Sequence, residues 1–507
     1  MSDLDLTALS AVELRRRIGA RQLLPSALLE ACLARIEALN PHINAFTATC
    51  FERARAEARD ADDALRQGRP LGLLHGLPIG IKDLEETAGL LTTYGSPLYR
   101  DNVPAHDNEL VRRLRAAGAI VVGKTNVPEM GAGANTRNAV WGATGNPFDP
   151  ALNAGGSSGG SAAALAADLV PLCSGSDTGG SLRIPAAKCG VVGLRTSPGL
   201  VPSERKPLGW TGISVVGPMG RTVADTRLQL AATVGRYDAD PLSYDASAGD
   251  YAGTAQDLAG LRIGYTEDFG VCEVDEDIRR VFRDKIAALA PRVARCEAIT
   301  PDMDGAHRSF DVVRAQNFVI SMRDAYRKDP QSLGPNSRAN FELGIAMTLE
   351  DVAAAHAVQT RIFRSFQRLF DDYDLILSPV TPVSPFPWSQ LYLDAVNGRP
   401  LENYYRWLSL TYVVTLATNP ALSLPCGRDH RGMPFGLQVI GGFRQDALLL
   451  DRAQALEAAF ADDPLLARPL PDIERLRAAD VDLRTLVTHP PGAHTGPAGG
   501  HGSGAPV

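Results

Sequence analysis

Residues 169–187, LVPLCSGSDTGGSLRIPAA, predict a strand, a tight glycine turn and a helix in immediate succession. In such a turn we expect four backbone N–H groups to be free beside the hydroxyl of Ser181, those of Thr178, Gly179, Gly180 and Ser181. Backbone N–H groups at the start of a helix stabilise negative charge, as a developing oxyanion requires. Ser181 is therefore either a candidate nucleophile or the N-cap of the following helix.

The region around this turn, residues 71–235, alternates short apolar runs with glycine-rich turns and alanine-rich helices. That alternation is typical of an α/β sheet, and the runs LPIGI, AIVVG and LVPLCSG are its candidate strands. Similar runs return in residues 371–485 as DLILSP, NPALSLP and PFGLQVIGG. We therefore expect an α/β protein whose C-terminal part completes the same sheet.

The remaining segments are expected to be helical or unstructured. Residues 1–70 carry apolar residues at helical spacing and predict an N-terminal helical scaffold of the same unit. Residues 236–370 have a charged, helical pattern and predict a cover or insert, where substrate choice is often made. Residues 486–507 are rich in proline, glycine and histidine and predict a disordered tail, whose histidines lack metal-ligand spacing.

The composition excludes several classes of protein. The 507-residue chain has a net charge of -7, so it lacks the basic excess that nucleic acid attracts. Its N-terminus has acids where a signal peptide needs basic residues, and no stretch reaches the roughly 18 apolar residues of a membrane span. The seven cysteines contain no C-x-x-C pair, so neither disulfides nor a zinc site is expected. We expect a cytoplasmic protein with no nucleic-acid or membrane partner.

Lysine is rare in this chain, with six among 51 lysines and arginines, so each lysine is a candidate for a specific role. Lys82 ends the apolar run of GLPIGIKDL (76–84), where a lysine either reaches the surface or is buried. Burial lowers the pKa of a lysine, and a neutral lysine can act as a base near pH 7.

A second glycine-rich segment, NAGGSSGGSAAALAADL (153–169), places Ser157 ahead of an alanine-rich helix. A linker or a helix cap would account for the glycines and serines, but a linker is not usually followed at once by a packed helix. No histidine lies between His106 and His307, so a nucleophilic Ser181 needs another base. Lys82 meets that need, and Ser157 can relay the proton because a hydroxyl both donates and accepts.

Two further motif matches fail on their local context. GAIVVGKT (118–125) satisfies the phosphate-binding pattern G-x-x-x-x-G-K-[ST], but its AIVV run predicts a strand where a phosphate site needs a loop. GGSSG (155–159) matches the nucleophile elbow G-x-S-x-G, but the preceding NPFDPALNA predicts a loop where the elbow needs a strand. Neither an NTP site nor an α/β-hydrolase is expected.

The segments GLPIGIKDL, GGSSGGSAAA and GSDTGGSLRIPAAKCGVVGLR together resemble the amidase signature family of serine hydrolases, over residues 5–475. The resemblance implies a single large α/β/α unit with a central mixed β-sheet covered by helices. It implies a triad in which Ser181 is the acylated nucleophile, Ser157 is the proton shuttle and Lys82 is the general base and acid. It also implies that the peptide bond between Gly156 and Ser157 is cis. It implies an oxyanion hole formed by Thr178, Gly179, Gly180 and Ser181. It assigns supporting roles to Ser158, Asp177 and Arg183, and it implies no metal or cofactor.

The function implied by the resemblance is that of an amidase, which hydrolyses carbon–nitrogen bonds other than peptide bonds. The expected substrate is a small to medium acyl or aryl amide, or a related ester or carbamate, cleaved through an acyl-enzyme. The alternative is a glutamine-dependent amidotransferase A-type subunit, which acts with partner subunits on aminoacyl-tRNA. Those subunits usually carry glutamine after the arginine of GGSxR, where this chain has Ile184. We therefore expect a stand-alone amidase acting on a small-molecule amide; homodimerisation is expected from the family alone.

Overall fold

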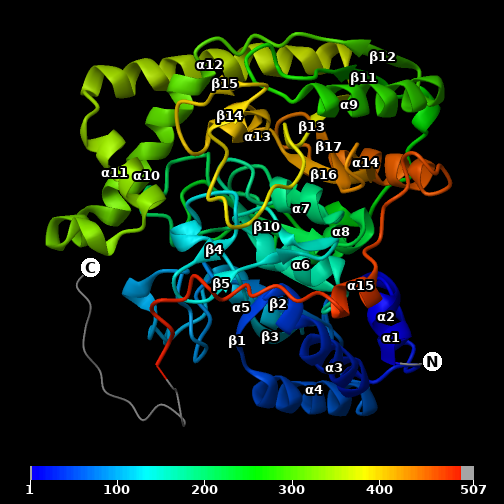
Figure 1. Ribbon diagram of the computed structural model, residues 1–507. Coiled ribbons are helices and arrows are strands. Elements are labelled where there is room, and N and C mark those ends of the chain that lie inside the picture. The colour runs from blue at the N-terminus through cyan, green and yellow to red at the C-terminus, as the bar shows by residue number, and fades with distance from the viewer. Residues whose placement is uncertain (1–2, 493–507) are drawn as a thin grey trace.

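The computed structural model describes residues 3–492 and is built around one 11-stranded sheet (Figure 1). β2 runs parallel to its neighbours β3 and β8, and β11 to β12 and β13, whereas the other neighbours are antiparallel. The sheet is therefore mixed, and the expected α/β fold is confirmed. In spatial order its strands are β1 (Phe46–Thr49), β3 (Ile120–Thr125), β2 (Pro78–Lys82), β8 (Leu172–Asp177), β10 (Val215–Gly220), β9 (Val192–Arg195), β16 (Ala421–Arg428), β17 (Pro434–Ile440), β13 (Leu375–Pro379), β11 (Arg262–Tyr265) and β12 (Arg295–Ala298).

Helices cover both faces of this sheet. Leu172 and Cys173 are neighbours in β8 but belong to different apolar clusters, because successive side chains of a strand point to opposite faces. α3 and α6 pack in the cluster of Cys173, and α5, α8 and α14 in that of Leu172. The helices are α1 (Asp3–Ala8), α2 (Ala11–Gly19), α3 (Pro25–Ile43), α4 (Phe51–Arg66), α5 (Glu109–Ala116), α6 (Gly159–Ala166), α7 (Arg183–Cys189), α8 (Val223–Ala231), α9 (Glu276–Leu289), α10 (Ala306–Lys328), α11 (Pro335–Ile345), α12 (Leu349–Asp372), α13 (Ser409–Leu416), α14 (Asp446–Phe460) and α15 (Ile473–Arg477).

The alanine-rich helix α6 lies directly against the strands that carry the candidate residues. All eight of its residues are buried, and it packs on β2, β3 and β8. A Cβ atom at Gly160 would collide with the backbone of Asn126 and Ala45, so only glycine permits this approach. Small side chains thus bring the start of α6, and Ser157 just before it, close to the sheet.

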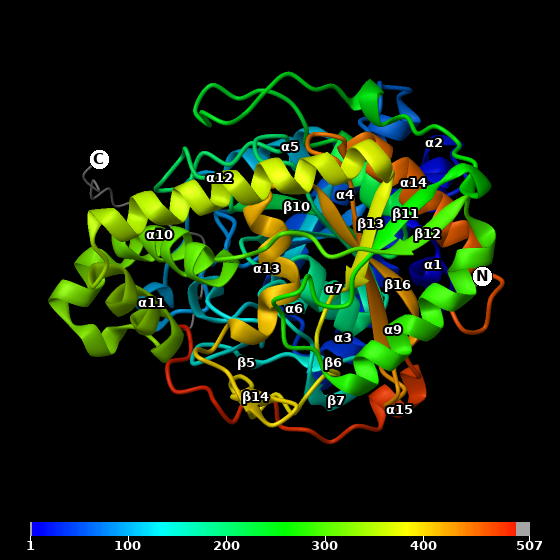
Figure 2. The ribbon, with the colours of Figure 1, turned by 90° about the horizontal axis from the view of Figure 1, so that it is seen from above.

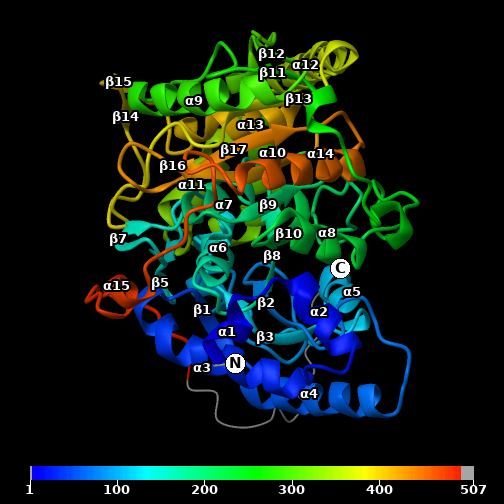
Figure 3. The ribbon, with the colours of Figure 1, turned by 90° about the vertical axis from the view of Figure 1, so that its right-hand side faces the viewer.

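The segment predicted as a helical cover, residues 236–370, differs from that prediction in one respect. It contains α9 to α12, but it also contributes β11 and β12 to the far end of the sheet, opposite α3 and α4 (Figure 3). RIGY and RCEA are runs of only four residues, and the edge strand β12 has no buried residue, so neither run carries a clear apolar pattern. Seen from above, α10, α11 and α12 extend to one side of the sheet (Figure 2).

Three short two-stranded ribbons complete the structure: β4 (Arg137–Asn138) with β5 (Gly142–Ala143), β6 (Gly145–Asn146) with β7 (Asp149–Asn153), and β14 (Ala395–Val396) with β15 (Arg399–Pro400). The predicted loop before GGSSG is thus in part a strand, β7, but it pairs with β6 outside the central sheet. GAIVVGKT contains β3, so the strand predicted for its AIVV run is confirmed.

Near the C-terminus, the described part of the predicted tail, 486–492, is held against the body of the protein. Thr488 and His489 donate backbone hydrogen bonds to the carbonyl of Ala139, and the N–H of Gly492 donates to Asp101. Residues 493–507 lie outside the described residues. Among the described helices, none combines the length and the apolar character needed to cross a membrane.

Candidate active site

The candidate residues meet at the carboxyl ends of β2 and β8. These parallel neighbours are in register at Ile79 with Leu172 and at Gly80 with Cys173, so both strands end at the same edge. Lys82 is the last residue of β2, and the turn that carries Ser181 follows β8. Ligands of α/β sheets bind at this kind of edge, where loops leave the ends of parallel strands.

Lys82 is fully buried and its amine faces two serines. Nζ lies 2.8 Å from Oγ of Ser157, 2.9 Å from Oγ of Ser176 and 3.3 Å from the carbonyl oxygen of Ser176. A neutral amine has two N–H bonds and one lone pair. Donation of both N–H bonds to Ser176 leaves the lone pair directed at the hydroxyl of Ser157.

Burial lowers the pKa of Lys82 to about 7, because removal from water disfavours the ammonium form. The carboxylates of Glu85 and Asp177 oppose this shift. Of the two alternatives for Lys82, the structure therefore shows the buried one, which a base near pH 7 requires, and the side chain does not reach the surface. Near neutral pH a large fraction of Lys82 is a free amine that can take up a proton.

A second buried lysine, Lys124, lies one strand away in β3. It donates hydrogen bonds to the carbonyl of Glu85 and to Oγ1 of Thr87, 3.1 Å away. Burial lowers its pKa to about 8, against the raising effect of Asp83 and Glu85. Lys124 thus braces the loop that follows Lys82, and its place within a strand excludes the phosphate-binding role suggested by GAIVVGKT.

Ser157 and Ser181 share a cavity of about 170 Å³ at this edge. The peptide bond between Gly156 and Ser157 is cis, as the family resemblance implies. Ser158 is buried beside them, and its N–H donates to the carbonyl of Ser181 at 3.2 Å. The residues that line the cavity are Leu84, Met130, Gly131, Ser157, Ser176, Thr178, Ser181, Ser214, Arg314, Asn317, Phe318, Ser321 and Met322.

The turn that carries Ser181 is held by Asp177, the last residue of β8. One carboxylate oxygen accepts from the N–H of Gly180 at 2.9 Å and the other from the N–H of Leu182 at 3.1 Å. The expectation that the Gly180 N–H is free for an oxyanion is therefore wrong, because the carboxylate uses it to brace the turn. Among the described residues, none accepts a hydrogen bond from the N–H of Thr178, Gly179 or Ser181, so these three donors remain available.

Two buried arginines neutralise Asp177. Arg183 lies 2.9 Å and Arg195 3.3 Å from the same carboxylate oxygen, and all three side chains are fully buried. Burial alone would raise the pKa of Asp177, but the two guanidinium groups hold it well below its usual value. Asp177 therefore stays ionised near neutral pH, and its carboxylate holds the turn through the N–H groups of Gly180 and Leu182.

Residues of α13, which lies more than 200 positions later in the sequence, also contact the turn. Oγ1 of Thr411 in α13 donates to the carbonyl of Gly179 at 2.6 Å. Gly180 has a φ of +125°, and a Cβ atom there would collide with the side chain of Thr411. Only glycine fits this position, on both backbone and steric grounds. Tyr412 stacks on Phe310 of α10 with ring centroids 4.2 Å apart, which places α10 against α13 beside the turn.

The structure adds site residues that the sequence did not single out. Ser176 contacts Lys82, and its signal is the spacing of Ser174 and Ser176, which lie two residues apart and so on the same face of β8. Arg195 pairs with Asp177 from β9, and Arg314 enters the cavity from α10. No local pattern marks either arginine, because each contact joins segments distant in sequence.

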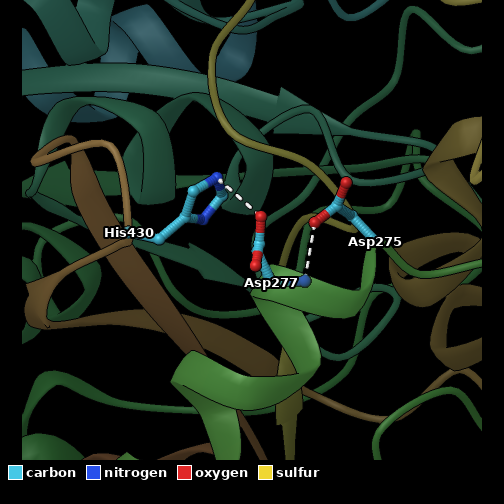
Figure 4. Close-up of side chains that lie close together, drawn as sticks. All are labelled: Asp275, Asp277 and His430. Carbon is cyan, nitrogen blue, oxygen red and sulfur yellow. Dashed lines mark hydrogen bonds and ion pairs between the residues drawn. The ribbon is translucent and has the colours of Figure 1, made fainter.

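One cluster outside this site has the composition of a metal site. Donor atoms of Asp275, Asp277 and His430 lie within 4.8 Å of one another (Figure 4). Asp275 is the N-cap of α9, and its Oδ1 accepts from the backbone N–H groups of Asp277 and Ile278. Nε2 of His430 lies 3.7 Å from Asp277 in a surface pair. Helix capping therefore accounts for the position of Asp275.

Comparisons with known proteins agree with this geometry. The family model described as Amidase matches residues 27–450. The chain is 34% identical to an acylamidase of Rhodococcus erythropolis, over 90% of this chain and 97% of that protein. It is 35% identical to the A-type subunit of the glutamyl-tRNA(Gln) amidotransferase of Acaryochloris marina (strain MBIC 11017), over 85% and 93%. The solved structure of a bacterial aryl acylamidase of the amidase signature family superposes with a TM-score of 0.84 at 26% identity, covering 90% of this chain and 96% of that one. The chain belongs to the amidase signature family.

Proposed function

We propose that this protein is a stand-alone serine amidohydrolase that cleaves a small to medium acyl or aryl amide through an acyl-enzyme. One observation carries the proposal: a buried lysine with a lowered pKa lies 2.8 Å from Ser157, in the cavity that also holds Ser181. This arrangement supplies a nucleophile and a proton acceptor without histidine.

In the proposed reaction, Oγ of Ser181 attacks the amide carbonyl carbon while its proton passes to Ser157, whose own proton passes to Lys82. The carbonyl oxygen becomes an oxyanion facing the N–H groups of Thr178, Gly179 and Ser181. The carbon–nitrogen bond then breaks, and the leaving nitrogen takes a proton from Lys82 through Ser157. Water attacks the acyl-enzyme by the same relay, which releases the carboxylic acid and restores Ser181.

Ser157 and Ser181 are not joined by a hydrogen bond between their hydroxyls in the part of the chain that the structure describes, although both line the cavity. In the proposed reaction, rotation of the Ser181 side chain or the binding of substrate brings the two hydroxyls into hydrogen-bonding distance. Contacts of this kind are often long before substrate binds.

The alternative function, an amidotransferase A-type subunit, is favoured by the similarity to the Acaryochloris marina protein. Two observations support the stand-alone enzyme. The similarity to an acylamidase is as extensive, and Ile184 stands where amidotransferase subunits usually carry glutamine. Ile184 is buried at the start of α7, next to the turn.

The test is amine release from primary amides, anilides and aryl carbamates, with glutamine included as an amidotransferase substrate. We expect turnover of at least one anilide or amide by the purified chain, loss of that turnover in Ser181→Ala and Lys82→Met, and little change in the matched surface variant Lys328→Met. A fluorophosphonate should label Ser181 in the wild type and in Lys328→Met. Ammonia release from glutamine alone, with no other amide cleaved, would favour the amidotransferase.

A further inference from the structure

One face of α10 forms a wall of the candidate active site. The cavity residues from this helix are three to four positions apart, as expected for one helical face: Arg314, Asn317, Phe318, Ser321 and Met322. α10 belongs to the segment between β12 and β13, so this wall is independent of the strands that carry the lysine and the serines. Its composition therefore bears on which substrate is bound.

Arg314 is the most unusual member of this wall, because it is a buried cation that has no carboxylate within 4 Å among residues 3–492. It is 7% exposed, and its guanidinium group donates to Oδ1 of Asn340 and, at 2.8 Å, to the hydroxyl of Tyr404. The guanidinium also lies over the rings of Tyr405 and Phe318, 4.6 Å and 4.8 Å from their centroids. These neutral partners orient Arg314 but leave its charge uncompensated.

The other buried arginines of residues 3–492 are all compensated. Each lies within 4 Å of a carboxylate: Arg35 and Arg221 of Asp168, Arg183 and Arg195 of Asp177, Arg227 of Asp451, and Arg406 of Asp311 and Glu402. Arg314 is the exception within that range. Asp311, one helical turn before it, is already shared by Arg406 and the hydroxyl of Tyr405. A buried charge without a counter-charge is costly, so an arginine that lines a binding cavity favours an anion from outside the chain.

Asn317 supplies a second donor one turn along the same wall. Its Nδ2 is buried and has no hydrogen-bond acceptor among the described residues. An unpaired buried donor is also costly, and a carboxylate can accept from a guanidinium and an amide at once. The two observations are independent, since one concerns charge and the other hydrogen bonding, and both residues line one cavity.

We propose that the substrate carries a carboxylate, which Arg314 and Asn317 bind inside the cavity while Ser181 attacks the amide. This inference rests on the proposed function. The cavity is small, at about 170 Å³, and it continues into a groove of about 680 Å³ that shares Ser176, Thr178 and Ser214 with it. Arg314 and Asn317 line the cavity but not the groove, so the charged end lies in the cavity and the remainder of the substrate extends into the groove.

The test uses matched pairs of substrates that differ only in charge. Succinyl 4-nitroanilide is compared with butyryl 4-nitroanilide, which places the carboxylate on the acyl side. N-butyryl-4-aminobenzoate is compared with N-butyrylaniline, which places it on the amine side. We expect one of the two charged compounds to exceed its neutral partner at least 10-fold in kcat/KM, and the pair that responds identifies the side that Arg314 binds.

Variants then assign the preference to the wall. Arg314→Gln should lower kcat/KM for the preferred charged substrate at least 10-fold and change that for its neutral partner less than 3-fold, and Arg314→Lys should recover part of the loss. Arg323→Gln, on the exposed face of the same helix, is the matched control and should leave the charged-to-neutral ratio unchanged. An Arg314→Gln enzyme with an unaltered ratio would show that Arg314 serves packing alone. If Arg314→Gln does not fold, Asn317→Ala takes its place and should likewise lower the charged-to-neutral ratio of kcat/KM.

A binding measurement separates this inference from the proposed function. Calorimetry with Ser181→Ala, which should not cleave the amides, should show one of the two charged substrates binding more tightly than its neutral partner, and Arg314→Gln in that background should abolish the difference. If wild-type protein hydrolyses none of the amides yet this difference is present, the proposed function fails and the carboxylate site stands. If amides are hydrolysed but the charged and neutral members of both pairs bind alike, the carboxylate site fails and the proposed function stands.

Discussion

Lys82 combines two properties that conflict for most lysines, since it is a long basic side chain and it is completely removed from water. The carboxylates of Glu85 and Asp177 favour its charged form, and burial outweighs them. A pKa near 7 results, which matches the demand on a group that must first accept and then return a proton near neutral pH.

The first prediction follows from this pKa. In the proposed reaction the reactive form of Lys82 is the neutral amine, so kcat/KM for amide hydrolysis should rise as pH increases through about 7 and level off above it. Below that pKa the ammonium form cannot accept the proton of Ser157, and log kcat/KM should fall by about one per pH unit. Rates measured with a neutral amide from pH 5 to 9 check this. A flat profile across that range would exclude Lys82 as the proton acceptor.

Ser176 is the subject of a second prediction. Its Oγ accepts from Lys82, and such a bond stabilises the ammonium form more than the amine. Ser176→Ala should therefore shift the rising limb of the pH profile to lower pH and reduce the plateau about 10-fold, the cost of one hydrogen bond to a charged group. Ser174→Ala is the matched control: Ser174 accepts from the backbone N–H of Lys82, so its loss should leave the limb in place.

At the scale of elements, the β8–turn–α7 unit depends on one carboxylate and two guanidinium groups. Asp177→Asn leaves Arg183 and Arg195 buried without a counter-charge, so we expect a loss of about 3–5 kcal/mol in the free energy of unfolding. Asp238→Asn breaks the exposed pair with Arg236 and should cost less than about 1 kcal/mol. Urea unfolding of both variants checks this. Equal effects would mean that the buried network contributes no more than a surface pair.

The sequence predicted the elements that carry local signals and missed those that do not. The strand, turn and helix around Ser181 were marked by an apolar run, two glycines and a helical pattern, and the glycines before α6 marked Ser157. β11 and β12 were missed because four-residue strands at the end of a sheet need no apolar alternation. The use of the Gly180 N–H by Asp177 was missed because a motif names residues and does not assign their hydrogen bonds. Arg314 was missed because its significance lies in having no ion pair among the described residues, which a sequence does not reveal.

At the scale of the whole molecule, buried titratable groups make stability depend on pH. Lys188 is the clearest case: it is buried, donates to Asn153 at 3.0 Å, and lies over the rings of Phe386 and Trp407. Burial lowers its pKa from 10.5 to about 7. In the unfolded chain it binds its proton below about pH 10.4. As pH falls from about 10 to 7 the unfolded state gains this proton first, so this lysine costs stability progressively over that window, and the cost is constant below it.

The corresponding prediction compares the wild type with Lys188→Met. The stability of the variant relative to the wild type should increase as pH is lowered from 10 to 7, by at most about 4 kcal/mol, and then stay constant to pH 5. The two aromatic rings stabilise the ammonium form and reduce this figure. Urea midpoints measured at each pH for both proteins check the trend. A difference that does not vary with pH would mean that Lys188 keeps its proton when folded.

The path of the chain through α10, α11 and α12 has a consequence for how this protein can diverge. Residues 306–372 leave the sheet after β12 and return at β13, two strands separated by β11 alone. This segment therefore leaves and rejoins the sheet at nearby positions, yet it supplies one wall of the cavity that contains Ser157 and Ser181. Substitutions on the cavity face of α10 can therefore change this wall, and with it the range of molecules that fit, while β2 and β8, which position Lys82 and the turn of Ser181, keep their sequence.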